Sequence, residues 1–165
     1  MKLKEGSLEE MAEKALRSCL QIVPFLKIEK IAREVKVGPG EDKIDLVATV
    51  RFGQSRRKIF VEVKNIGQPR VVRFAISQLK RYCDRSQDSY CVFSAPYISE
   101  QAAEICINEG IGFYDFAGNC RLNIDRIFII QKGNPNPFSE KRDLRSLYSP
   151  KAERVLRVLL NNTMR

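Results

Sequence analysis

The 165-residue sequence contains no histidine. This absence excludes a Ser-His-Asp triad, a Cys-His pair, a histidine-ligated zinc site and a histidine general base. Any catalysis by this chain must therefore use carboxylates, lysine, tyrosine, cysteine or a metal ion held by oxygen ligands.

Closely spaced cysteine pairs are also missing. The chain has five cysteines, and no two of them stand in a C-x-x-C arrangement. Four lie inside apolar segments, which favours reduced thiols in the hydrophobic core. The five are Cys19, Cys83, Cys91, Cys106 and Cys120.

No apolar run approaches the roughly 20 residues that a membrane span needs. The first seven residues are polar and lead directly into an amphipathic segment, unlike a secretory signal peptide. We therefore expect a cytoplasmic protein with no membrane partner.

Basic residues outnumber acidic ones, 29 to 20, which gives a formal net charge of +9. Such a surplus on a chain of about one domain favours a polyanionic partner, either nucleic acid or an anionic membrane surface. A basic protein without such a partner is the alternative. Apolar residues make up 44% and charged residues 30%, the balance of a folded globular chain.

Hydrophobic periodicity predicts a regular order of elements. Ser7 and Glu10 form a capping-box pattern, which predicts a helix from Ser7 to about Leu20. Further elements follow as strands 30–37, 43–52 and 57–64, helix 69–84, strand 89–95, helix 99–109, and a hairpin of 111–116 with 121–131. This order predicts an α/β domain in which a mixed β-sheet is flanked by helices around an αβββαβ core.

The composition changes after residue 137. We expect a core domain over residues 1–137, a basic linker over 138–148 and a C-terminal helix over 149–165. That helix either packs back onto the core or opens a winged-helix domain that is cut short.

Three charged residues interrupt strands that are otherwise apolar. They are Asp45, Glu62 and Lys64, and burying such charges is costly unless they are paired or coordinate an ion. A two-residue turn at Gly53-Gln54 places Asp45 opposite Glu62, whereas a four-residue loop places it opposite Lys64. All three side chains share one sheet face in either register.

Two neighbouring carboxylates favour a divalent cation with oxygen ligands. A lysine beside them can lower the pKa of a metal-bound water or stabilise charge that develops on phosphate. This set suits hydrolysis of a phosphodiester. The alternative is a cross-strand ion pair on a solvated sheet face.

The Asp45 segment followed by Val61-Glu-Val-Lys64 resembles the PD-(D/E)xK, or restriction-endonuclease-like, nuclease superfamily. The local sequence is most similar to the branches of Holliday-junction resolvases, Mrr-type restriction enzymes and RecB-type nucleases. Ile44 stands where the family name has a proline. The resemblance implies that Asp45 and Glu62 bind Mg²⁺, with Mn²⁺ as an alternative, and that Lys64 assists the attacking water.

The resemblance also implies supporting residues on the first and second helices. Family members often carry a glutamate on the first helix, and Glu9 is our choice because it borders the apolar stripe. Gln78 and Tyr82 match the Gln-x-x-x-Tyr pattern of RecB-type members. Glu41 and Asp42 add acidic groups just before Asp45 and could supplement the ligands.

DNA is the expected partner, and a homodimer is an open alternative. The predicted nucleic-acid-binding residues are basic or aromatic and are Arg56, Arg57, Lys58, Arg70, Arg73, Lys80, Arg81 and Tyr82. We interpret residues 110–119 as a hairpin with close backbone approaches. The alternative is that Asp115 or Asn119 contacts substrate.

Three functions follow from these observations. The first is metal-dependent hydrolysis of DNA. The second is a catalytically inactive DNA-binding module of the same fold, such as part of a transcription regulator. The third is a structural or protein-interaction domain whose acidic residues are ion-paired.

Overall fold

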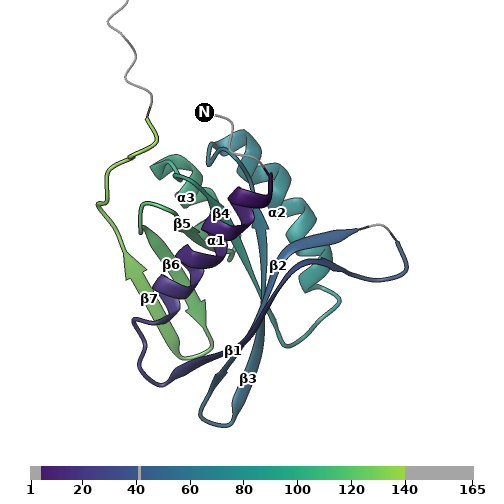
Figure 1. The fold of residues 1–165 in the computed structure, drawn as a ribbon. Coiled ribbons are helices and arrows are strands. Elements are labelled where there is room, and N and C mark those ends of the chain that lie inside the picture. Colours follow the sequence, from purple (N-terminus) through teal and green to yellow (C-terminus); the bar gives the residue numbers. More distant parts are fainter. Residues whose placement is uncertain (1–4, 41, 140–165) are drawn as a thin grey trace, which may run out of the picture.

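A computed structural model of the 165-residue chain describes residues 5–40 and 42–139 (Figure 1). The elements in chain order are α1 (Glu5–Leu20), β1 (Leu26–Lys36), β2 (Lys43–Phe52), β3 (Ser55–Val63), α2 (Pro69–Cys83), β4 (Ser89–Ala95), α3 (Glu100–Asn108), β5 (Gly112–Asp115), β6 (Cys120–Ile124) and β7 (Ile127–Gln131).

The strands form one mixed sheet in the order β1 to β7. Strands β3, β4 and β5 run parallel to one another, and the other neighbours are antiparallel. The expected mixed sheet with flanking helices and the element order α-β-β-β-α-β are confirmed.

Helices cover both faces of the sheet (Figure 1). Residues of α1, including Ala12 and Leu16, pack with Leu46 and Val61 in one hydrophobic cluster. Residues of α2 and α3 pack with Phe93 and the rest of a second cluster. Alternation along the strands produces this division, because successive side chains point to opposite faces.

The turn between β2 and β3 sets the register that the site depends on. Gly53 has φ of 58°, which favours glycine, and Phe52 pairs with Ser55 across the turn. The two-residue turn is confirmed, so the register with Asp45 opposite Lys64 is excluded.

The first helix differs from the sequence prediction. It begins at Glu5, two residues before Ser7, so the predicted capping box is wrong. Glu10 instead forms an ion pair with Lys14, with 2.8 Å between Oε1 and Nζ. An i,i+4 pair satisfies the charge as well as a cap would, and the sequence pattern does not separate the two.

Two strand predictions also need correction. Strand β1 begins at Leu26 rather than residue 30, and its register with β2 shifts between Ile28 and Lys30. This bulge interrupts the side-chain alternation, which hid the first part of the strand. Segment 121–131 is two strands, because Asp125 adopts a φ of 53° in a tight turn between them.

The cysteine prediction holds for part of the set. Cys19, Cys106 and Cys120 are free and buried, whereas Cys83 and Cys91 form a disulfide between the end of α2 and β4. Their Cα atoms are 6.4 Å apart, within the usual range for a disulfide. The pairing depends on how α2 packs against β4, which the sequence spacing of eight does not reveal.

The linker and C-terminal helix predicted over residues 138–165 lie outside the described residues, apart from Phe138 and Ser139. Among the described helices, none is long and apolar enough to span a membrane.

Candidate metal and nuclease site

Strands β2 and β3 separate at one end, and the site forms there. Their backbone pairing runs from the turn as far as the pair Leu46 and Val61. Asp45 is the next residue of β2 beyond this last pair. The backbone N–H of Val63 donates to Asp45 Oδ2 at 2.7 Å. The carboxylate therefore takes a hydrogen bond that a strand carbonyl would otherwise accept, which holds Asp45 against β3.

Glu62 and Lys64 lie at the end of β3, next to this point. Glu62 is 4% exposed and accepts a hydrogen bond of 2.5 Å on Oε1 from Lys64 Nζ. The Lys64 side chain is 29% exposed, so its ammonium keeps contact with solvent while it pairs with a buried carboxylate. The last paired residues are Leu46 and Val61, so Asp45 and Glu62 are the next positions in the register that the two-residue turn sets.

Electrostatics link the two carboxylates. Burial raises the pKa of Asp45, against the Val63 hydrogen bond and the charge of Lys64. Burial also raises the pKa of Glu62, and the nearby charge of Asp45 raises it further, while Lys64 opposes both effects. A cation bound between the two groups would relieve the cost of keeping both ionised.

The donor set fits a divalent cation that prefers oxygen. Asp45 Oδ1 and Glu62 Oε2 accept no hydrogen bond from any described residue. In the described ranges, the buried side-chain atoms without a hydrogen-bond partner are Gln78 Oε1 and Ser94 Oγ. The two carboxylate oxygens are not among them. Each carboxylate therefore offers one oxygen that solvent or an ion can reach. Within residues 5–40 and 42–139 no group of three acidic or cysteine side chains is placed to hold a metal. Mg²⁺ nevertheless commonly uses only one or two carboxylates together with water and phosphate.

Helix α2 brings Tyr82 toward the carboxylates. Tyr82 is buried, and its pKa is raised by burial and then by the charges of Asp42, Glu62 and Asp45. Gln78 lies one turn earlier on the same helix, and its Oε1 is sealed without a hydrogen-bond donor. A role for Gln78 in catalysis and for Tyr82 in DNA binding stays a prediction.

The remaining acidic candidates are Glu9, Glu41 and Asp42. Glu9 is half-buried on α1, the helix that packs on the sheet face opposite α2. Its catalytic role stays a prediction. Asp42 is exposed, and Glu41 lies outside the described residues.

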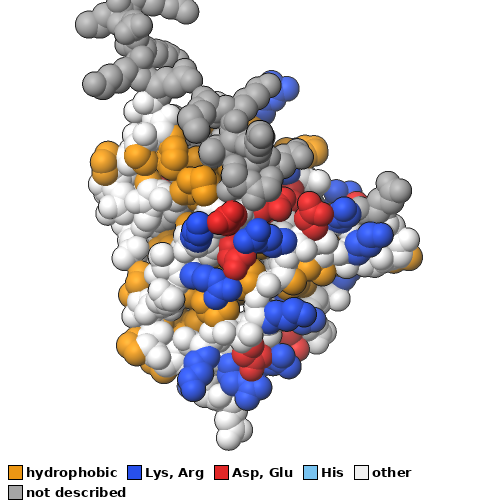
Figure 2. All heavy atoms as spheres, viewed as in Figure 1, with side chains coloured by type: hydrophobic (Ala, Val, Ile, Leu, Met, Phe, Trp, Pro, Cys, Tyr) orange, Lys and Arg blue, Asp and Glu red, His pale blue; other side chains and the backbone are white. Residues whose placement is uncertain are grey.

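The predicted DNA-binding residues fall into two groups. Arg56 pairs with Glu29, Arg57 with Asp88 and Asp125, and Lys80 with Glu109. The second group is exposed and has no acidic partner within the described ranges; it comprises Lys58, Arg70, Arg73 and Arg81. On the face shown in Figure 2, Lys and Arg side chains stand among Asp and Glu rather than in one continuous basic field.

Asp115 has a structural environment. It is fully buried, and Oδ1 accepts from the Asn119 backbone N–H at 2.8 Å. Oδ2 accepts from Asn119 Nδ2 at 2.9 Å and from the Ile98 N–H at 3.3 Å. These bonds build the turn between β5 and β6, which agrees with the hairpin interpretation of residues 110–119.

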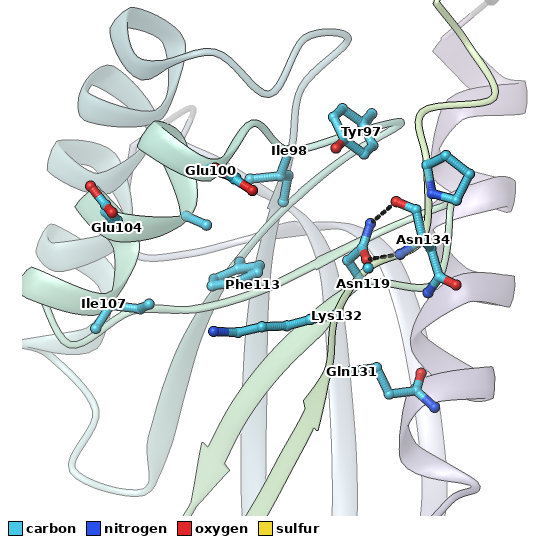
Figure 3. A pocket seen from close by; sticks show the side chains of 13 residues that line it. Tyr97, Ile98, Glu100, Glu104, Ile107, Phe113, Asn119, Gln131, Lys132 and Asn134 are labelled. Carbon is cyan, nitrogen blue, oxygen red and sulfur yellow. Dashed lines mark hydrogen bonds between the residues drawn. The ribbon is translucent and has the colours of Figure 1, made fainter.

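Sequence reasoning did not single out Lys132 and Asn134. They follow β7 and line a pocket beside α3 (Figure 3). The one sequence feature near this pocket is the Gly-Asn-Pro-Asn-Pro segment of residues 133–137, which does not by itself indicate a pocket.

Comparisons with known proteins found structural likeness only. No family model matches the chain, and no curated protein matches it. The chain is similar to a repair endonuclease from Pyrococcus abyssi, at 22% identity and a TM-score of 0.47, over 70% of this chain and 47% of that one. It is also similar to EndoMS in a complex with dsDNA, at 18% identity and a TM-score of 0.45, over 70% and 46% of the two chains. EndoMS in its apo form is similar at 18% identity and a TM-score of 0.43, over 70% of this chain and 47% of that one.

The matched region spans about half the length of these structures. The backbone likeness is limited at such TM-scores, and it carries no argument about activity. The functional proposal therefore depends on the side chains at the end of β2 and β3.

Proposed function

We propose that the chain hydrolyses phosphodiester bonds of DNA in a divalent-metal-dependent reaction. The observation that carries the proposal is half-buried Asp45 beside buried Glu62, each with one oxygen free, with Lys64 hydrogen-bonded to Glu62. This combination supplies oxygen ligands for a cation and a positive charge beside them, and it would be costly to bury without a use.

Asp45 and Glu62 would hold Mg²⁺ or Mn²⁺ through Oδ1 and Oε2. A bound metal ion supplies Lewis-acid stabilisation of charge on a phosphate oxygen and acidifies a bound water. The Val63 N–H fixes Asp45 Oδ2, so the carboxylate orientation does not depend on the substrate. Lys64 is close enough to Glu62 to move its ammonium from the carboxylate toward a substrate phosphate or the attacking water.

Resemblance to the PD-(D/E)xK superfamily supports this assignment of roles. The exposed cations Lys58, Arg70, Arg73 and Arg81 would bind the DNA backbone. We further propose that the protein acts in the cytoplasm.

A cleavage assay tests the proposal. Purified protein is incubated with supercoiled, linear, single-stranded and branched DNA in Mg²⁺, in Mn²⁺ and in EDTA. We expect metal-dependent cleavage by the wild type and none by Asp45→Ala or Lys64→Ala. Isothermal titration with Mn²⁺ gives a separate readout, because Asp45→Ala should lose metal binding whereas Lys64→Ala should keep it.

A DNA-binding module without cleavage is the second candidate. One observation favours it: Lys64 already neutralises Glu62, and no third metal-ligating side chain joins the pair among the described residues. Salt-sensitive DNA binding by the wild type and by both variants, without cleavage in either metal, would establish this function and overturn the first.

A further inference from the structure

A pocket of about 430 Å³ lies between α3 and the segment that follows β7 (Figure 3). Its apolar part is formed by Ile98, Ala103, Ile107 and the ring of Phe113. The volume lies within the roughly 300–1,000 Å³ that ligand pockets usually have. Phe113 and Ile98 are buried, so the aromatic ring that a flat, uncharged group can contact is that of half-buried Tyr97.

The polar wall of the pocket is held rigidly. Asn119 Oδ1 accepts from the Asn134 N–H at 2.9 Å, and Asn119 Nδ2 donates to the Asn134 carbonyl at 3.1 Å (Figure 3). Asn119 Nδ2 also donates to buried Asp115. The side-chain amide of Asn134 has no hydrogen-bond partner among the described residues, so it remains available as both donor and acceptor.

The charge around the pocket disfavours an anion. Glu100 and Glu104, one turn apart on α3, both line it, and Lys132 is the one basic side chain in its described lining. A phosphate group would meet two carboxylates there. An uncharged ring that hydrogen-bonds to an amide meets no such cost.

The pocket lies on the same sheet face as the carboxylate site. Glu62 of β3 is in register with Phe93 of β4, which is in register with Phe113 of β5. Two strand spacings, about 10 Å, therefore separate the Glu62 backbone from that of the pocket floor.

The two sites also share one sheet edge. Lys64 follows β3, Tyr97 and Ile98 follow β4, and Asn119 follows β5, and these three strands are parallel. Their carboxyl ends meet at one edge, where ligands of α/β sheets usually bind. Gly67 and Ile98 touch across this edge so closely that a Cβ on Gly67 would collide with Ile98 and the Tyr97 carbonyl. The loops after β3 and β4 thus connect the two sites directly.

We propose that this pocket binds one unpaired base of the DNA strand whose phosphodiester lies at Asp45 and Glu62. The inference rests on the proposed function and names its substrate class as DNA with a single-stranded stretch beside the cleaved bond. In a duplex each base is paired and stacked between neighbours about 3.4 Å away, so it reaches a pocket only after unpairing and unstacking, a cost that an unpaired base avoids. An unpaired base can leave the stack and bind to an aromatic ring and an amide.

Fluorescence anisotropy in EDTA tests the proposal without cleavage. The probes are a labelled single-stranded oligonucleotide, the same strand in a full duplex, and the single strand with abasic positions. We expect the wild type to bind the single strand more tightly than the abasic strand by about tenfold, the effect of one stacked base. Ala103→Phe fills the pocket and Tyr97→Ala removes part of its wall, and both should abolish this difference.

Gln101→Ala is the matched control, because Gln101 is exposed on α3 and does not line the pocket. It should retain the tenfold difference. Melting temperatures identify a variant that fails to fold, and Tyr97→Ala serves if the larger side chain of Ala103→Phe is not accommodated. Equal binding of normal and abasic strands by the wild type, or an unchanged difference in folded Tyr97→Ala, would overturn the proposal.

Failure of this inference is distinguishable from failure of the proposed function. Metal-dependent cleavage with no pocket-dependent base preference would refute base binding in the pocket and support the nuclease function. Pocket-dependent binding of the single strand without cleavage in Mg²⁺ or Mn²⁺ would support base binding in the pocket and refute the hydrolytic function.

Discussion

Asp115 and the pair of half-buried Asp45 and buried Glu62 are acidic sites on one sheet, and they differ in how their oxygens are used. Burial raises the pKa of all three carboxyl groups. Asp115 has hydrogen bonds on both oxygens, all from nearby backbone or side-chain N–H groups. Asp45 and Glu62 each have a protein donor on one oxygen and leave the other open.

The difference teaches that a raised pKa does not by itself identify a functional carboxylate. A buried charge whose hydrogen-bonding capacity is fully used by the protein stabilises a turn, and it offers nothing to a ligand. A buried carboxylate with one oxygen lacking a protein donor costs folding free energy, and that oxygen is available to a ligand. Substitutions that affect the two sites differently can break or sharpen this comparison.

The largest expected difference concerns cleavage. Glu62→Gln should lower the cleavage rate by about 100- to 1,000-fold, because the neutral amide neither ligates a cation strongly nor pairs with Lys64. Asp115→Asn, assayed at a temperature where it is folded, should cleave at a rate close to the wild type. A matched loss of activity in folded Asp115→Asn would show that the two sites do not differ in role.

Stability should respond in the opposite way. Asp115→Ala should lower the free energy of unfolding by about 2–4 kcal/mol, because it leaves the buried N–H groups of Ile98 and Asn119 without an acceptor. Urea unfolding followed by circular dichroism measures this loss. A decrease below about 1 kcal/mol would mean that the turn tolerates unpaired donors and that Asp115 is not structural.

Asp45→Asn should have a smaller, stabilising effect. Its amide oxygen can still accept from the Val63 N–H, while the charge that raises the pKa of Glu62 is gone. At neutral pH the variant should gain about 0.5–2 kcal/mol in the free energy of unfolding, and it should not cleave DNA.

The pH dependence of this gain has a defined sign. The folded-state pKa of Asp45 is raised above its ordinary value of 3.8, so the wild-type carboxyl favours folding below that value and loses this contribution as pH rises through the folded pKa. The advantage of Asp45→Asn should therefore be near zero at pH 3 and full at pH 7. Glu104→Gln, at an exposed carboxylate outside any described ion pair, is the control and should show no such rise. An equal gain at both pH values would contradict a raised pKa.

Local patterns predicted most of the fold and the centre of the site. Alternation in β2 and β3, together with the turn at Gly53, sets the register in which Asp45 and Glu62 directly follow the last pair, Leu46 and Val61. The apolar stripe of α2 predicts which face packs on the sheet, but it did not predict that Tyr82, assigned to DNA binding from the sequence, is buried there. These features depend on residues close together in the sequence, where periodicity carries the information.

The remaining features depend on contacts between distant segments. Arg57 pairs with Asp125, 68 residues away, and this removes one predicted DNA-binding cation from the free set. The Cys83–Cys91 disulfide and the pocket beside Asn134 depend on how helices and loops pack against the sheet. Residue spacing does not encode such packing, so the sequence predicts the composition of a surface better than its pairing.

The contrast between used and unused charges extends to the cations, where the smallest effect is expected. Arg56 is paired with Glu29 at 2.7 Å, whereas Arg73 is exposed and has no acidic partner among the described residues. If Arg73 binds a phosphate, Arg73→Ala should lower the slope of log K against log salt by about 0.9 for duplex DNA. Arg56→Ala should change the slope less, because Arg56 must first leave Glu29 to reach DNA. Anisotropy titrations over a range of salt concentrations measure both slopes. A larger change for Arg56→Ala would show that ion pairs on this surface open readily for DNA, and that a partner in the free protein does not mark a cation as structural.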